Sequence, residues 1–578
     1  MVITMFLKKR HLEILKMMKE TDNIKKIEKS LPEDFSNRII ELRILDLVDV
    51  KEDSIKFTEG GKKLVEVLDN LNVDELPDIF INSEIIKILQ LLEETGIIND
   101  DWATLLKERQ LIDEEGNINT VGKTILEIYN TTHPTIYLTK DILSFISGMP
   151  KLGLYSELVS YRDSKGMGQN IVNALEGMRL LLISPNTENG KAFTTTEALN
   201  DALKISSLVP NAEVLILKKE DFEALKGGNT TDYSNEVGYY KDGKITDLGQ
   251  SMVDMYENIG KTATVKILPI YVLEDEIDVL NAISDIEEKY KTNPEIIPTY
   301  NEINKRVNMD NLGEVIHILQ SKELIKPEVI KNKDTYWLTS YGRKVMGFGP
   351  VSTDGTKAVV YPKSGDVPIS DWVIVGKEEG TVKGGITEKG KFLMELSKSI
   401  KRKPYLTKYD ISILLKTPVK RYIHKDELIK LIMDHVGGDE KEIIKAIGES
   451  ESKGFIVELQ NKCIKLTELG NNIKESIEMA KIPELLNTKF AITPTTFTIL
   501  ETIYNNKKDF DRVWKEKTEG KGKDHKENEI ILLGKLLKLT IDEIKKSLII
   551  LRNTGFIGKK GLTDASIKLV ESYKSLNN

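Results

Sequence analysis

One short pattern recurs along the chain of 578 residues and constrains its fold more than any other feature. An apolar residue is followed by Thr, two further residues and Gly, and then by a stretch with apolar residues at three- and four-residue steps. A threonine hydroxyl in this place can accept a hydrogen bond from an otherwise unpaired amide of the first helical turn. Looser copies occupy 118–129, with Asn119 in the threonine position, and 193–203. We therefore predict helix N-caps at Thr58, Thr246, Thr339, Thr387, Thr467 and Thr563.

Most copies of the pattern follow a pair of short amphipathic stretches, each pair separated by a polar turn and followed by two short apolar runs. These stretches indicate two helices and a β-hairpin. They lie at 24–48, 154–181, 297–325, 427–456 and 529–557. Several units also open with a short apolar strand, a cap and a helix, as at 136–146 and 405–415. The repeated order is strand, three helices, hairpin, helix, which indicates a tandem array.

The pattern divides the chain into units of unequal completeness. We predict units at 1–72, 73–132 (short), 133–206, 207–262 (degenerate), 263–349, 401–482 and 483–578, with a β-rich insertion and a closing helix at 350–400. Residues 212–243 leave room for one strand and one short helix. The polar stretch 506–528 indicates a loop or a frayed helix.

The units resemble winged helix-turn-helix modules of the MarR and ArsR type, joined in tandem, and the whole chain resembles an uncharacterised archaeal family with a domain of unknown function. The resemblance implies a mainly α fold with small β-hairpins (α+β), built of tandem winged-helix repeats plus the small β-rich insertion. It implies no activity, because winged helices serve as DNA readers, RNA binders and protein adaptors alike.

Composition excludes several classes of protein. The chain has 83 Lys and Arg against 91 Asp and Glu, a net charge of −8, which excludes a uniformly basic nucleic-acid coat. Cys463 is the single cysteine, so intramolecular disulfides and zinc ribbons are excluded. No apolar run approaches the roughly 20 residues of a membrane span. The first residues do not form a secretory signal, and we expect a cytoplasmic protein that does not contact a membrane.

No set of residues has the spacing that catalysis requires. The glycine-rich stretch 376–385 lacks the Lys-Ser/Thr ending of a phosphate-binding loop. His424 and His435 stand near Asp434 and Asp439, but no His-Glu-x-x-His pair is present, and a solvated helix surface is favoured. We expect no catalytic residues, no cofactor and no metal, and therefore no enzyme.

The charges that open the predicted third helices oppose binding to phosphates. Carboxylates stand at four of the five openings: Glu33 and Asp34, Asp310 and Glu314, Asp439 and Glu440, Asp542 and Glu543. They suit the helix dipole and repel the phosphates on which DNA binding depends. The opening around 162–170, with Arg162, Lys165, Gln169 and Asn170, is neutral to basic. Protein partners are thus favoured, and we expect a non-catalytic binding or scaffold protein.

A basic C-terminal third keeps a second hypothesis open, that of a nucleic-acid-binding regulator. Between 398 and 425, nine Lys and Arg oppose Asp410 alone, although a charge run is usually a solvated face. The candidate residues for nucleic acid or an acidic partner are Lys401, Arg402, Lys403, Lys420, Arg421, Lys545, Lys546, Arg552, Lys559 and Lys560. The sequence does not indicate an oligomeric state.

Overall fold

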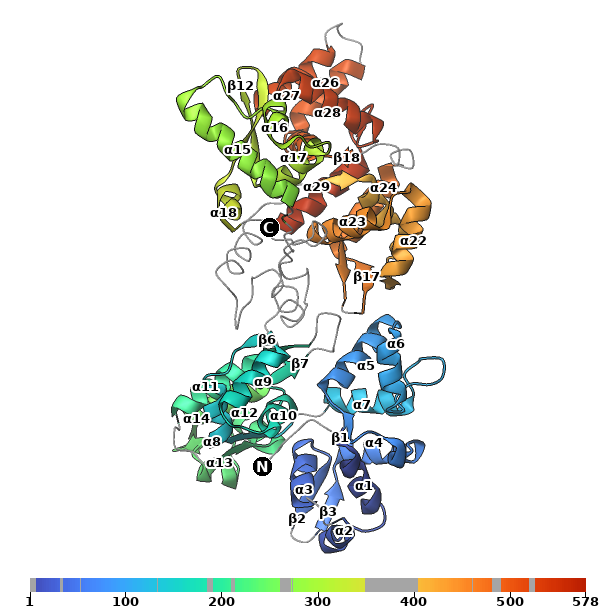
Figure 1. Cartoon of the computed structure of the whole chain (residues 1–578), viewed down its shortest axis with the longest axis vertical. Helices are drawn as coiled ribbons and strands as arrows, with labels where there is room; N and C mark the ends of the chain where they lie inside the picture. The colour runs from blue at the N-terminus through green and yellow to red at the C-terminus, as the bar shows by residue number, and fades with distance from the viewer. Residues whose placement is uncertain are drawn as a thin grey trace. The chain divides into compact units, whose positions relative to one another are not determined.

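The structure is a computed structural model that describes residues 7–31, 35–51, 54–131, 134–183, 191–208, 214–259, 272, 274–348, 404–459, 461–480, 490–518 and 525–577. The chain divides into two compact units. Unit 1 holds segment A (7–131) and segment B (134–259), and unit 2 holds segment C (274–348) and segment D (404–577). Both units are mainly helical with small sheets (Figure 1). No helix in the described ranges is long and apolar enough to cross a membrane.

Segment B consists of a long module and a short one. The long module contains β5 (Ile136–Thr139), α8 (Lys140–Ile146), β6 (Leu152–Leu154), α9 (Tyr155–Ser164), α10 (Gln169–Gly177), β7 (Leu181–Ile183), β8 (Ala192–Thr195) and α11 (Glu197–Leu208). The short module contains β9 (Val214–Leu217), α12 (Lys219–Lys226), α13 (Asp232–Glu236), β10 (Tyr240–Lys241), β11 (Lys244–Ile245) and α14 (Asp247–Glu257). The strand order β6-β8-β7 places the strand that follows the first helix beside the hairpin.

Segment D has the same plan with a longer second module. Its first module contains β14 (Leu406–Thr407), α21 (Lys408–Lys416), β15 (Ile423–His424), α22 (Lys425–Val436), α23 (Glu440–Ser452), β16 (Ile456–Glu458), β17 (Cys463–Leu466) and α24 (Glu468–Ala480). The second contains β18 (Phe490–Ile492), α25 (Pro494–Asn505), α26 (Lys507–Thr518), α27 (His525–Leu536), α28 (Ile541–Asn553), β19 (Ile557–Gly558), β20 (Gly561–Leu562) and α29 (Asp564–Asn577). The order β15-β17-β16 matches that of segment B.

Segments A and C repeat the long module, but an isolated β-bridge replaces the strand that follows the first helix. This bridge joins Asn23 to Ser54 in segment A and Thr299 to Thr335 in segment C. Segment A contains β1 (Leu7–Lys8), α1 (Lys9–Met18), α2 (Ile24–Ser30), α3 (Phe35–Ile44), β2 (Val48–Lys51), β3 (Ser54–Phe57) and α4 (Glu59–Val67), and then β4 (Ile79–Ile81), α5 (Ser83–Thr95), α6 (Asp100–Lys107) and α7 (Thr120–Thr131). Segment C contains α15 (Glu274–Thr292), α16 (Tyr300–Val307), α17 (Leu312–Ser321), β12 (Ile325–Ile330), β13 (Lys333–Leu338) and α18 (Ser340–Phe348).

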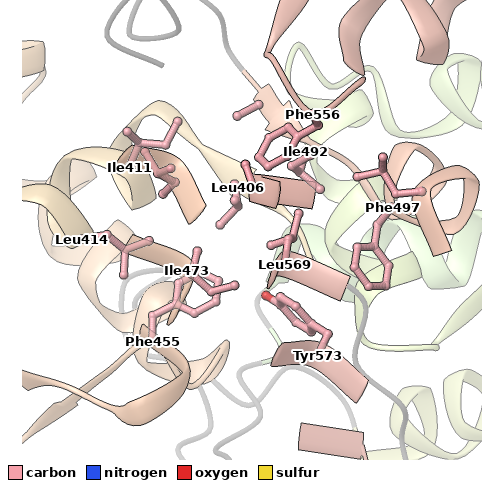
Figure 2. Close-up of a cluster of buried hydrophobic side chains, with 14 of the residues drawn as sticks. Leu406, Ile411, Leu414, Phe455, Ile473, Ile492, Phe497, Phe556, Leu569 and Tyr573 are labelled. Carbon is pink, nitrogen blue, oxygen red and sulfur yellow. The ribbon is translucent and has the colours of Figure 1, made fainter. Parts of the chain in front are cut away.

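Two modules of a segment are joined in the same way in A, B and D. The strand that opens one module pairs antiparallel with the strand that opens the next: β1 with β4, β5 with β9, β14 with β18. The helices that close the two modules also pack together, α4 on α7, α11 on α14 and α24 on α29. In segment D, Leu406, Phe455 and Ile473 of the first module converge with Phe497 and Leu569 of the second in one buried cluster (Figure 2).

The threonine caps predicted from the sequence are confirmed wherever the structure describes them. Thr58, Thr246, Thr339 and Thr467 each accept a hydrogen bond from the amide three residues later, at 3.0–3.2 Å. Thr563 does the same with Ser566 at 3.4 Å. Each hydroxyl also donates to a backbone carbonyl at the start of the hairpin, such as Glu323 O for Thr339. The cap therefore fastens the closing helix to the hairpin. Thr387 and the whole of 350–400 lie outside the described residues.

The glycine of the pattern is required by close packing. A Cβ on Gly61, Gly249, Gly342 or Gly470 would stand only 1.9–2.2 Å from the carbonyl oxygen that precedes the hairpin's first strand. That carbonyl accepts the backbone amide of the capping threonine, as in Thr467 N to Phe455 O at 3.0 Å. Helix and hairpin thus approach so closely that no side chain fits between them.

One local prediction was wrong, and a second left open a choice between loop and helix that the structure decides. The stretch 212–243 holds two helices after its strand, because Thr231 caps α13 by accepting the Ser234 amide. The first part of 506–528 forms α26, whose Phe510 and Trp514 lie one turn apart and are buried in the segment D cluster. The polar composition of the stretch did not indicate this helix, because only two aromatic residues bury its apolar face and the remaining residues are mostly charged.

Candidate functional site

The predicted basic residues that the structure describes lie on two modules of segment D. Lys545 and Lys546 are exposed on α28, and Lys559 and Lys560 are exposed in the turn between β19 and β20. The two lysine pairs therefore belong to one module. Lys420 and Arg421 are exposed in the other module, just before β15. Arg552 forms an ion pair with Glu529. Lys401, Arg402 and Lys403 lie outside the described residues.

The N-cap of α28 contacts the hairpin of segment C. Thr540, the N-cap of α28, donates a hydrogen bond to Asp334 of β13 at 3.3 Å. Burial and the neighbouring Asp334 carboxylate raise the pKa of Glu543 in the first turn. Thr540 and Glu543 are therefore engaged within unit 2, whereas Ile541, Asp542, Lys545 and Lys546 remain exposed.

In unit 1, the third helix of segment B packs against a helix start in segment A. Burial raises the pKa of Glu176 on α10 to about 8, next to the Ser83 backbone amide at the start of α5. The side chain is 6% exposed. Beside it, Lys191 binds Glu84 of α5 at 2.6 Å. A protonated carboxyl is the form that such an environment favours.

The third helices of segments C and D, α17 and α23, are also used inside unit 2. Lys322, which follows α17, binds Glu276 of α15 at 2.9 Å and lies 3.8 Å from Glu449 of α23. Lys445 of α23 lies 3.9 Å from Asp275 of α15. Seven of the ten residues of α17 are buried. Both helices are therefore packed within unit 2, α17 through its end and α23 through its middle and C-terminal part.

Between α17, the start of α21 and α23 lies a cleft of about 770 Å³. Its carboxylates are Glu314, Asp410, Glu442 and Glu449, and its lysines are Lys408, Lys445 and Lys453. Asp410 is buried and accepts hydrogen bonds from Ser450 at 2.6 Å and from Lys453 at 2.7 Å. It also forms the capping box of α21 with Thr407. Asp410 and Lys453 thus hold the floor of the cleft in place.

Two tyrosines bring their hydroxyl groups next to the carboxylates of the cleft. Tyr409 donates to Glu442 at 2.8 Å, and burial together with this carboxylate raises its pKa to about 12. Burial, followed by the charges of Glu314, Asp410 and Glu449, raises the pKa of Tyr405 well above its usual value. Ammonium groups already lie on both rings, Lys453 at 4.4 Å from the Tyr405 centroid and Lys408 at 4.9 Å from that of Tyr409. The cleft therefore carries a negative field beside aromatic surface.

The cleft was missed by reasoning from the sequence. Glu314 is separated from Tyr405 and Glu449 by a long stretch of chain, and Glu314 was interpreted only as a helix-dipole charge. One local signal was available, the run Tyr405 to Asp410, because a threonine cap flanked by two tyrosines presents aromatic and acidic groups together. In the described part of the chain, no three His, Cys, Asp or Glu side chains are grouped so that they could hold a metal ion.

Comparison with known proteins gives a family and a relative. A family model described as "Protein of unknown function (DUF505)" matches twice in tandem, at residues 5–309 and 306–573. The chain is 65% identical over 570 residues to an uncharacterised protein, MJ1355, of Methanocaldococcus jannaschii, covering 98% of this chain and 99% of that protein. No solved structure matches the chain. The double match supports a tandem repeat, although the two matches meet at residues 306–309, inside segment C and not at the unit boundary after residue 265.

Proposed function

The chain belongs to the DUF505 family, and we propose that it is a non-catalytic cytoplasmic scaffold of tandem winged-helix modules that binds other proteins. The observation that carries this proposal is the packing of the helices that precede the hairpins. Residues in or beside α10, α17, α23 and α28 contact other modules: Glu176, Lys322, Lys445 and Thr540. A winged helix that reads DNA needs the helix before its hairpin free to enter the major groove.

The winged-helix assignment is supported by element order. Segments B and D combine a strand after the first helix with a hairpin after the third. That order, with a closing helix capped by threonine, is the order of winged helices. The strand pairing and closing-helix packing that join two modules would then place winged helices in pairs along one chain.

Exposed apolar side chains on segment D also support a protein partner. Ile531 and Leu536 on α27 and Ile541 and Ile549 on α28 are exposed, Ile541 at 58% and Ile549 at 56%. Exposed apolar side chains gain free energy when a protein partner covers them, and they contribute nothing to the counterion release that dominates nucleic-acid binding.

The test of the proposal is capture of partners from an extract of the native cells. The tagged full-length protein is incubated with extract that has been treated with nuclease, beside an Ile541→Lys, Ile549→Lys variant. We expect partners that resist nuclease and are lost with the variant. Loss of every partner on nuclease treatment would contradict the proposal. The matched control is Lys420→Glu, on the other module, which leaves capture unchanged.

A second function, nucleic-acid binding, is favoured by one observation. Lys545, Lys546, Lys559 and Lys560 are exposed on one module, on the helix before its hairpin and in the hairpin turn, and these two elements contact DNA in winged helices. Fluorescence anisotropy with random duplex DNA and single-stranded RNA across a salt series measures this directly. The scaffold proposal expects no micromolar binding near physiological salt. Micromolar binding that disappears when the four lysines become Glu would establish the alternative instead.

A further inference from the structure

The second module of segment D exposes large apolar side chains on two helices that pack together, α27 and α28. Ile541 and Ile549 of α28 are 58% and 56% exposed, more than any other large apolar side chain that the structure describes. Ile531 and Leu536 of α27 and Ile550 of α28 are exposed as well. Because apolar side chains gain free energy when they leave water, this set indicates a surface that a partner covers.

Lysines without carboxylate partners lie on the same elements. The lysines exposed on α27, on α28, in the loop between these helices and in the β19–β20 turn form no ion pair or hydrogen bond with another described residue: Lys535, Lys538, Lys545, Lys546, Lys559 and Lys560. By contrast, Arg552 at the end of α28 binds Glu529. Asp542 is exposed in the first turn of α28, where a carboxylate suits the helix dipole. The lysines therefore leave positive charge available for a partner.

Isoleucines and a lysine alternate along one exposed stripe of α28. Ile541, Lys545 and Ile549 follow one another at four-residue steps, so they lie along one face of the helix. The two isoleucines stand about 12 Å apart along the helix axis. The opposite face is buried in the core of segment D, with Ile544 and Leu548 in the cluster. Residues seven or eight positions apart on a second helix have nearly the same separation, so one partner helix can cover both isoleucines.

We propose that the exposed face of α28, together with the β19–β20 turn, binds an acidic amphipathic helix of a partner protein. Apolar side chains of that helix cover Ile541 and Ile549, and its carboxylates pair with Lys545, Lys546 and the lysines of the turn. Apolar anchors of this kind hold an amphipathic helix on a protein surface, and complementary charges set its orientation. The inference rests on the proposed function, because it names the kind of protein that the scaffold binds.

The apolar stripe distinguishes this partner from two other negatively charged macromolecules. A nucleic acid gains from the lysines through counterion release, but its phosphates leave Ile541 and Ile549 without apolar contact. An anionic membrane binds a helix whose continuous apolar face enters the acyl region. The continuous apolar face of α28 is already buried, with Ile544 and Leu548 in the core of segment D. An acidic amphipathic helix satisfies both the isoleucines and the lysines.

The experiment is fluorescence anisotropy of the full-length protein with fluorescent synthetic peptides. The first peptide is an amphipathic helix of leucine and glutamate, with leucines at three- and four-residue steps. The second has the same composition in scrambled order, and the third has lysine in place of glutamate. We expect a dissociation constant below about 100 μM for the first peptide and about tenfold weaker binding of the second. The third should not bind. Absence of binding by the first peptide, or equal binding by the scrambled or the basic peptide, would overturn the proposal.

A double variant, Lys545→Gln with Ile549→Ala, locates the site. It removes one charge and one apolar contact from the exposed stripe without entering the core, and it should weaken binding of the first peptide about tenfold or more. The matched control is Val419→Ala with Lys420→Gln, which removes an exposed apolar side chain and an exposed lysine from the other module. The control should change binding less than about twofold. Equal losses in both variants would mean that the peptide binds by general surface charge, and the assignment would be wrong.

The other occupants of this face are tested with the same double variant. Vesicles of phosphatidylglycerol, random duplex DNA and the protein alone, in light scattering at rising concentration, serve as probes. Binding of vesicles or DNA, or formation of a dimer, that is lost in the double variant while the acidic peptide does not bind would assign the face to that occupant instead. If nuclease-resistant partners are captured but no peptide binds, the scaffold stands and this inference falls. If the peptide binds and capture yields nothing, the inference stands and the scaffold proposal falls.

Discussion

The first modules of segments B and D have the same element order, and both segments join their two modules in the same way, yet the third helices of these first modules have opposite surroundings. In segment B, α10 buries the Glu176 carboxyl beside the start of α5. In segment D, α23 lines an open cleft with Glu442, Lys445 and Glu449. This difference shows that the element order of a module does not determine what contacts the outer face of its third helix. What packs against that face decides whether it becomes a closed contact or a polar cavity.

The largest loss of stability is expected when the glycine of the closing helix, which both segments share, is replaced. Gly470→Ala would place a Cβ 1.9 Å from Phe455 O, so helix and hairpin must separate. We expect a loss of about 4–5 kcal/mol in the free energy of unfolding, measured by denaturant titration. Gly249→Ala, with its Cβ at 2.1 Å from Tyr239 O, should act similarly in segment B.

The matched control for these substitutions is Gly448→Ala in α23, where a Cβ meets no atom within 4 Å. This variant should raise stability by about 0.5–1 kcal/mol, because alanine favours a helix interior. Equal losses for Gly448→Ala and Gly470→Ala would refute the close-packing explanation.

The buried carboxyl of segment B should give unit 1 a distinctive pH dependence. Burial raises the Glu176 pKa from 4.5 to about 8, so the folded state binds a proton that the unfolded state has released. The contribution of this group to stability is fully present below pH 4.5 and is lost as the pH rises toward 8. Glu176→Gln should remove that loss and stabilise unit 1 by about 3 kcal/mol at pH 9.

Thermal unfolding of wild type and Glu176→Gln between pH 5 and pH 9 measures this effect. Glu440→Gln, on the exposed start of α23, serves as control and should give a profile parallel to wild type. If the stability of Glu176→Gln and that of wild type change with pH in parallel, Glu176 is not buried from water at the contact between α10 and α5.

The threonine cap should matter equally in both segments. Thr467→Ala in segment D and Thr246→Ala in segment B each remove an acceptor for a first-turn amide and a donor to a hairpin carbonyl. We expect each to lower the free energy of unfolding by about 0.5–2 kcal/mol. The Thr→Ser variants keep the hydroxyl and should recover most of the loss. A serine variant as unstable as the alanine variant would assign the effect to the lost methyl group.

The smallest effect is expected at the edge of the cleft. Lys445 and Asp275 lie 3.9 Å apart with side chains 35% and 28% exposed, and such pairs contribute about 0.5 kcal/mol or less. Lys445→Met should therefore leave unfolding almost unchanged, and a double-mutant cycle with Asp275→Asn measures the coupling. A coupling above about 1 kcal/mol would mean that this pair, and not the Lys322–Glu449 pair, holds α23 against segment C.

Much of the architecture could be predicted from local chemistry. The helix starts could be predicted because a capping threonine binds an amide of its own first turn; these threonines are Thr58, Thr246, Thr339, Thr467 and Thr563. Five helix–turn–helix–hairpin stretches could be recognised from the periodicity of their apolar residues. The sequence does not decide between loop and helix at α26, because its anchors, Phe510 and Trp514, acquire meaning only beside the rest of segment D. The predicted basic residues are exposed where described.

The sequence by itself determined the repeat: where helices begin and which residue caps them, since these depend on contacts close along the chain. The reason for the glycine appeared only in the structure, in its close approach to a carbonyl before the hairpin. Only the tertiary structure decided what the third helices do. Glu176 meets Ser83, Thr540 meets Asp334, and Glu314 faces Glu449 across long separations in sequence. Such contacts depend on how whole modules pack. The hydrophobic pattern of one helix shows which face is buried, but it does not identify the element that packs against that face.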